Sequence, residues 1–125
     1  MSGPVDVLPP FLRNYIIRNG WTALKPIQKR TLEIADGSGC NILISAGTSG
    51  GKTEAAFFPV ITSLYRDKPK GIGALYISPL KALIDDQNER LERMLRDSDI
   101  QVFGWHADAS SSRKDRLRIH PEGIV

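Results

Sequence analysis

Cysteine and long apolar runs are scarce in this sequence. Cys40 is the only cysteine among 125 residues, so the chain can form no internal disulfide framework and no zinc site built from several cysteines. We expect Cys40 to be a small residue packed in front of a strand. No apolar stretch approaches the roughly 20 residues of a membrane-spanning helix. Residues 1–10 lack the basic start and apolar core of a secretory signal, so a cytoplasmic location is the default expectation.

The excess of one sign of charge is also small. The formal net charge is +3, with 41% hydrophobic and 25% charged residues. These proportions are typical of one small globular domain and unlike those of a disordered chain. A mildly basic balance permits binding to nucleic acid but does not require it.

Hydrophobic periodicity predicts helices that alternate with strands. Apolar residues recur at helical spacing in several stretches, some of which begin with proline or serine. Short continuous apolar runs indicate strands that are covered on both faces. The expected helices are residues 10–19, 26–35, 52–64, 80–96 and 110–119, and the expected strands are 41–45, 72–77, 100–105 and one that opens at 124.

This alternation predicts an α/β fold with a parallel sheet flanked by helices, because right-handed crossovers connect parallel strands. Ligands on such sheets bind at the carboxyl ends of the strands. The loop that follows Ser45 lies at such an end, between an expected strand and an expected helix.

That loop fits the phosphate-loop pattern in all but its first position, where alanine replaces glycine. Glycines let successive backbone N–H groups surround phosphate oxygens, and the following helix adds its N-terminal dipole. Lys52 would reach the β- and γ-phosphates, and the Thr53 hydroxyl would coordinate Mg²⁺. The alternative is a glycine-rich turn with an incidental lysine. The expected nucleotide-binding residues here are Ala46, Gly47, Thr48, Ser49, Gly50, Gly51, Lys52 and Thr53, with Lys52 and Thr53 in catalytic roles.

The same stretch resembles motif I of superfamily 2 DEAD/DEAH-box helicases, and its Thr-Ser form is similar to the large helicase-related branch. Many DEAD-box members have glycine at the position of Ser49. The resemblance extends from about Phe11 to Val125. It implies a RecA-like phosphate-loop domain that uses ATP and Mg²⁺ and acts on DNA or RNA as a helicase or translocase.

Two further segments stand where this family would place them. Residues 20–28 resemble the Q motif, in which a glutamine reads adenine, so the resemblance assigns that role to Gln28. Taken alone, Gln28 would be a surface helix residue. Residues 78–83 resemble motif Ia, which holds the backbone of a single strand. The expected nucleic-acid-binding residues are Pro79, Leu80, Lys81 and Gln87.

Residues 105–114 resemble the stretch between motifs Ia and II of large helicase-related proteins, with Ala107 in place of a glycine. Four basic residues make the following helix positive, so phosphate contact and a solvated basic face are both compatible with it. His106 has no partner pattern for metal binding or nucleophilic catalysis, and we assign it no chemistry.

The resemblance also implies a division of the chain and a missing remainder. We expect N-terminal helices with the Q-like motif over residues 1–36, and an incomplete RecA-like ATP-binding domain over residues 37–125. The family's Asp-Glu-x-His motif and second RecA-like domain would follow Val125. We therefore expect weak nucleotide binding at most, and negligible hydrolysis, from these residues alone.

Two other functions fit parts of the pattern. A small phosphate-loop kinase would explain the loop, but no carboxylate follows an expected strand in the way that such an enzyme requires. Alternatively, the chain is catalytically inert and acts only in binding.

Overall fold

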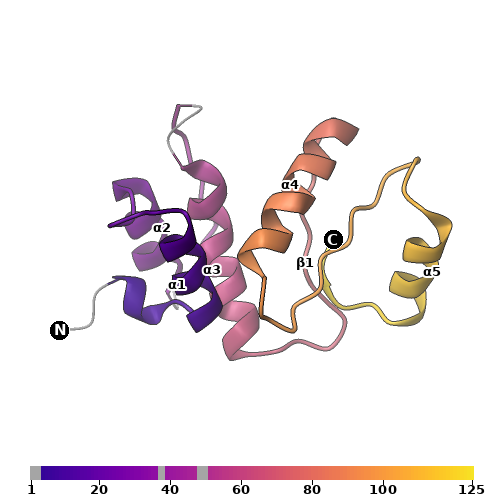
Figure 1. Ribbon diagram of the computed structural model, residues 1–125, viewed down its shortest axis with the longest axis horizontal. Coiled ribbons are helices and arrows are strands. Elements are labelled where there is room, and N and C mark those ends of the chain that lie inside the picture. The colour runs from indigo at the N-terminus through magenta and orange to yellow at the C-terminus, as the bar shows by residue number, and fades with distance from the viewer. Residues whose placement is uncertain (1–3, 37–38, 48–50) are drawn as a thin grey trace. The chain divides into compact units, whose positions relative to one another are not determined.

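The computed structural model describes residues 4–36, 39–47 and 51–125, which form two compact units, Met1–Arg66 and Asp67–Val125 (Figure 1). The first unit is helical, and the second combines a small parallel sheet with two helices. No helix among the residues described is both long and apolar enough to cross a membrane. The sequence predicted a different division, after Asp36, between the N-terminal helices and the RecA-like domain of the family. That division stays a prediction.

The first unit contains a 3-10 helix, η1 (Pro4–Val7), and three α-helices. Proline occupies the first position of two of them, where its missing N–H has no partner to lose. The first of these ends at Arg18, and the φ of +70° at Gly20 beyond it lets the Trp21 N–H bond back to the Ile16 carbonyl. The three helices are α1 (Pro10–Arg18), α2 (Pro26–Ala35) and α3 (Lys52–Arg66).

The core of this unit lies between α1, α2 and α3. Leu12, Phe58 and Ile61 are completely buried, and each contributes about 1.5–3 kcal/mol relative to an exposed side chain. The ring of Tyr15 packs edge-on against Phe58, with 6.4 Å between centroids. Helix α3 continues through Pro59, which lies within the helix that the sequence predicted over residues 52–64.

The second unit is built on β1 (Ile72–Ala74) and β2 (Gly123–Ile124), which pair in parallel. Ile124 also forms a parallel bridge with Val102 and is 1% exposed. β2 therefore lies between β1 and the segment around Val102. This parallel pairing confirms the type of sheet that the sequence predicted.

Two helices accompany this sheet, α4 (Lys81–Met94) and α5 (Ser111–Ile119). Helix α4 buries Leu91 and Met94, whereas α5 buries Leu117 alone. The side chain of Ser110 caps α5 by accepting a hydrogen bond from the Arg113 N–H. The expected helices are thus confirmed to within two residues at their ends.

The expected strand at residues 41–45 is wrong. The segment has no regular structure, Leu43 is 95% exposed, and Cys40 is exposed rather than packed. A continuous apolar run forms a strand only where a neighbour completes its hydrogen bonds. Neither β1 nor β2 pairs with residues 41–45.

The other expected strands are shorter than predicted. Residues 72–77 form a strand only as far as Ala74, beyond which Leu75 and Ile77 are exposed. Residues 100–105 are reduced to the single bridge at Val102. The side-chain pattern indicated these segments correctly, but strand length depends on the short partner β2.

Candidate nucleotide and nucleic-acid sites

The first site is the loop that precedes α3. Ala46 and Gly47 lie in irregular backbone, and Thr48, Ser49 and Gly50 fall outside the described residues. Gly51 has a φ of +79°, a region that favours glycine. A Cβ atom there would lie 2.5 Å from Gln28 Nε2. The glycine therefore meets both a backbone and a steric requirement.

Gln28 contacts this loop from the start of α2. Its Oε1 accepts a hydrogen bond from the Lys25 N–H at 2.9 Å, and its Nε2 donates to the Gly51 carbonyl at 3.4 Å. The residue is 1% exposed, so the surface position considered for it is wrong. One amide N–H and one oxygen lone pair remain beyond these two bonds. Adenine recognition by Gln28 stays a prediction.

Lys52 and Thr53 form the first turn of α3, directly after Gly51. Lys52 is exposed and Thr53 is half-buried. Backbone N–H groups at the start of a 15-residue helix favour an anion. The positive φ of Gly51 and the cation beside it are compatible with a phosphate-binding turn, and nucleotide binding by Lys52 and Thr53 stays a prediction.

A buried polar contact supports this turn. Glu54 is 2% exposed, and its Oε1 accepts a hydrogen bond from the Tyr15 hydroxyl at 3.1 Å. The bond fixes the start of α3 against α1. Glu54 was not among the expected site residues, because a glutamate in a helical pattern gives no sign of burial.

The second site lies at the start of α4. Pro79, Leu80 and Lys81 are exposed, and Leu80 occupies the N-cap position without a side-chain cap. The backbone N–H groups of this turn therefore gain no side-chain acceptor from Leu80. The structure brings these three predicted residues together on the surface of one unit.

Gln87, the fourth expected nucleic-acid ligand, lies further along α4. It lines a cavity of about 230 Å³ together with Ser78. Its Oε1 and the Ser78 hydroxyl are buried and have no hydrogen-bond partner within the part of the chain that the structure describes. Gln87 thus lines a partly open pocket of this unit, and its contact with nucleic acid stays a prediction.

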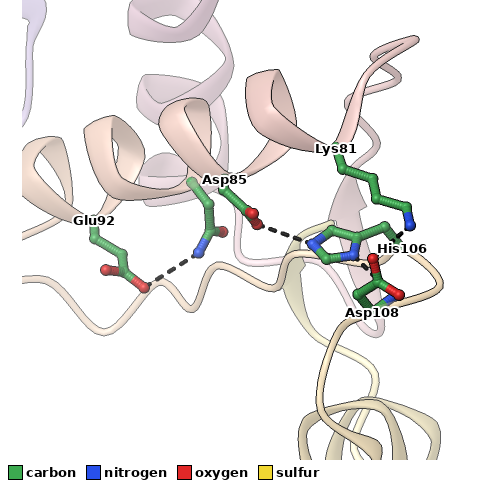
Figure 2. Close-up of polar contacts among 6 residues, drawn as sticks. Lys81, Asp85, Glu92, His106 and Asp108 are labelled. Carbon is green, nitrogen blue, oxygen red and sulfur yellow. Dashed lines mark hydrogen bonds and ion pairs between the residues drawn. The ribbon is translucent and has the colours of Figure 1, made fainter.

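Lys81 already has a partner, as Figure 2 shows. Its Nζ lies 2.5 Å from Asp108 Oδ2, and the Asp108 N–H donates to His106 Nδ1 at 3.2 Å. His106 Nε2 lies 2.9 Å from Asp85 Oδ1. Because Nδ1 accepts a hydrogen bond, the neutral ring carries its proton on Nε2 and donates it to Asp85. His106 therefore joins the loop to α4, a positioning role that its sequence neighbours did not indicate.

Shifted pKa values occur at a separate pair, Lys68 and Asp99. The hydrogen bond from Lys68 to Asp99, reinforced by their opposite charges, lowers the pKa of Asp99 and raises that of Lys68. Both side chains are exposed, so the pair contributes little to stability.

Comparison with known proteins identifies the relatives of this chain. Residues 25–125 match the family described as DEAD/DEAH box helicase. The chain is 31% identical to the ATP-dependent RNA helicase CshA of Limosilactobacillus reuteri over 111 residues, which cover 88% of this chain and 22% of that protein. It is 30% identical to the ATP-dependent helicase Lhr-Core of Saccharolobus solfataricus over an alignment of 133 residues, which covers 96% of this chain and 15% of that protein.

Solved structures share the fold. The helicase Lhr of Mycobacterium smegmatis, bound to single-stranded DNA and AMP-PNP, matches with a TM-score of 0.79 and 27% identity over 98% of this chain and 17% of that one. The RNA helicase Prp28 of Chaetomium thermophilum, bound to ADP, matches with a TM-score of 0.76 and 25% identity over 94% and 30%. The fold is therefore α/β and RecA-like. The chain spans about a fifth or less of the two curated relatives.

Proposed function

Because the chain belongs to the DEAD/DEAH box helicase family, we propose that it supplies the ATP-binding motif and part of the nucleic-acid surface of an ATP-dependent helicase or translocase. The observation that carries this proposal is the turn at Gly51 and Lys52. A glycine with positive φ, an exposed lysine and the start of a long helix meet there. Nucleotide-binding loops need this combination of groups.

The roles of the loop residues follow from their chemistry. Lys52 binds the β- and γ-phosphates, and Thr53 supplies its hydroxyl to Mg²⁺. Bound ATP with Mg²⁺ supplies the phosphoanhydride whose cleavage releases free energy. The remaining phosphate ligands are the backbone N–H groups of the loop, contributed by Ala46, Gly47, Thr48, Ser49, Gly50 and Gly51.

Gln28 reads the adenine edge with the N–H and the lone pair that its two internal hydrogen bonds leave over. Because the same amide contacts Gly51, adenine binding and loop geometry are coupled through one side chain. The amide matches the donor and acceptor of the adenine edge but not the two acceptors of guanine, so adenine nucleotides bind better than guanine nucleotides.

The nucleic-acid contacts assigned to this chain are Pro79, Leu80, Lys81 and Gln87. Lys81 binds a backbone phosphate, and the backbone N–H groups at the start of α4 add a favourable dipole. Since Lys81 is paired with Asp108, a phosphate competes with that carboxylate. A small kinase is not favoured, because the relatives and structural neighbours described above are helicases.

Equilibrium binding of a fluorescent ATP analogue tests the nucleotide site. We expect binding that requires Mg²⁺ and that weakens about tenfold or more in Lys52→Ala, which removes a charge-assisted phosphate contact. Lys70→Ala removes an exposed lysine outside the site and serves as the control. A wild-type protein that is folded by circular dichroism and binds no analogue would refute the nucleotide-binding part of the proposal.

A further inference from the structure

Trp105 is an exposed aromatic residue beside a basic helix. It is 41% exposed, with Lys114 Nζ 5.4 Å and Arg118 Cζ 5.3 Å from its ring centre. These two cations are four residues apart and therefore project from one side of α5. Cation–π attraction orders both side chains around the indole.

Helix α5 is not explained by core packing. Leu117 is its one buried residue, and its first turn contains no acidic side chain. Asp115 is its only acid and pairs with Arg118 at 3.1 Å. A helix that is polar on most of its surface gains little from tertiary burial. The cations that it presents are Arg113, Lys114, Arg116 and Arg118.

The backbone at Trp105 is fixed by residues that precede and follow it in the sequence. Phe103 is 9% exposed, and its N–H donates to the Ile124 carbonyl at 2.8 Å. His106 is bonded to Asp85 on α4. Trp105 therefore has a fixed backbone position, which lowers the entropic cost of binding a ligand.

Trp105 also lies where a parallel sheet binds ligands. It follows the segment that pairs with Ile124, and the residues at Ser78–Lys81 follow β1. The carboxyl ends of parallel segments meet at one edge of the sheet. The contact between Lys81 and Asp108 joins the two loops at that edge.

We propose that Trp105 and the four cations of α5 form a binding site for single-stranded nucleic acid, in which a base stacks on the indole and the cations hold adjacent phosphates. The proposal deepens the proposed function, since it adds a contact surface to the start of α4. Aromatic stacking combined with positive charge suits a single strand, whose bases are accessible. A duplex keeps its bases stacked and would engage the cations alone.

Tryptophan fluorescence measures this contact directly. Trp21→Phe leaves Trp105 as the one tryptophan of the chain. We expect a short oligothymidylate to quench its emission, and a duplex of equal length to quench it far less. Trp105→Leu should weaken oligothymidylate binding about fivefold or more, whereas Trp105→Phe should retain most of the affinity. Thermal unfolding of each variant checks that the fold is intact.

A matched pair of lysines tests the charge. Lys114→Gln should make the dependence of log K on log salt shallower by about 0.7, because one phosphate contact is lost. Lys70→Gln removes an equal charge from the same unit and should leave that slope unchanged. Equal slopes for the two variants would overturn the assignment of phosphate contacts to α5.

Three results separate this proposal from the function on which it rests. If the wild-type protein binds no oligothymidylate, the proposed nucleic-acid function fails with it. If binding occurs without quenching and Trp105→Leu binds normally, only the present proposal is overturned. If polyglutamate binds as tightly and depends equally on Trp105, the site is a general polyanion surface, and the proposal is again overturned.

Discussion

Gln28 Nε2 donates a hydrogen bond to the carbonyl oxygen of Gly51, 3.4 Å away, and so connects the start of α2 to the residue before α3. The same amide accepts the Lys25 N–H. One buried side chain therefore caps a helix and contacts the nucleotide loop. A substitution of either residue is therefore expected to disturb both the start of α2 and the nucleotide loop.

Gly51→Ala should lower the free energy of unfolding by more than a change of backbone alone explains. Its φ of +79° costs an L-residue about 1–2 kcal/mol, and the new Cβ would lie 2.5 Å from Gln28 Nε2. Moving the amide away leaves buried polar atoms unsatisfied, at about 1–3 kcal/mol. Urea unfolding measures the total.

Gly20→Ala is the control for this variant. Gly20 has a similar φ of +70°, but apart from its chain neighbours no atom of the described residues lies within 4 Å of the position that a Cβ would take there. We expect it to lose only the backbone contribution. Equal destabilisation of the two variants would show that the contact between Gly51 and Gln28 has no energetic weight.

Gln28→Glu should lower both the affinity for ATP and the free energy of unfolding, because it places a carboxylate at a buried position beside the Gly51 carbonyl. A carboxylate of the same shape still accepts the Lys25 N–H, but it cannot donate to the Gly51 carbonyl or to adenine. We expect a lower affinity for the ATP analogue and a smaller preference for it over the GTP analogue. Calorimetric titration with both analogues, compared with the wild-type protein, measures that preference.

Lys29→Gln changes an adjacent position on α2 and should leave the preference intact. An unchanged ratio of ATP to GTP affinity in Gln28→Glu would contradict adenine recognition by Gln28. That result would leave the phosphate contacts of Lys52 untouched, because they do not depend on the base.

Tyr15→Phe should destabilise the protein by about 1–3 kcal/mol, because it removes a hydrogen bond to the buried carboxylate of Glu54. The aromatic ring and its packing against Phe58 are retained. Tyr65→Phe is the matched control, since Tyr65 is 52% exposed and should tolerate the loss of its hydroxyl. A shift in the midpoint of thermal unfolding for Tyr15→Phe alone would support the buried role.

Local features of the sequence were sufficient to predict the helices. Pro10, Pro26 and Ser110 mark helix starts through their own backbone or side-chain chemistry, and the structure confirms each one. Strands depend on distant partners, so the apolar run at residues 41–45 gave a wrong prediction. Its apolar side chains indicated burial, but the run itself contains no information about which strand would pair with it.

The same difference between local and distant information applies to the candidate sites. The place of Lys52 at the start of α3 follows from residues beside it, and the structure agrees. The contact between Gln28 and Gly51 joins residues 23 apart in sequence, which no local pattern specifies. His106 was given no role because its partner Asp85, 21 residues away in the sequence, is brought to it by folding.

Asp108→Asn should strengthen the binding of single-stranded nucleic acid. Asp108 holds Lys81 at 2.5 Å, so a phosphate must displace the carboxylate before it can bind the lysine. Exposed ion pairs contribute about 0.2–1 kcal/mol, which corresponds to an increase in affinity of up to about fivefold. Fluorescence anisotropy of a labelled oligonucleotide at fixed salt concentration measures this change.

Asp99→Asn removes the same charge from an exposed ion pair elsewhere in the unit, that with Lys68, and so controls for the net charge. A second control is the Lys81→Ala background, in which Asp108→Asn should have no effect because the competing lysine is absent. If both asparagine variants raise the affinity equally, the gain comes from overall charge. If the effect of Asp108→Asn is confined to proteins that retain Lys81, the carboxylate and the phosphate compete for one cation, and Asp108 sets the affinity of this surface for its ligand.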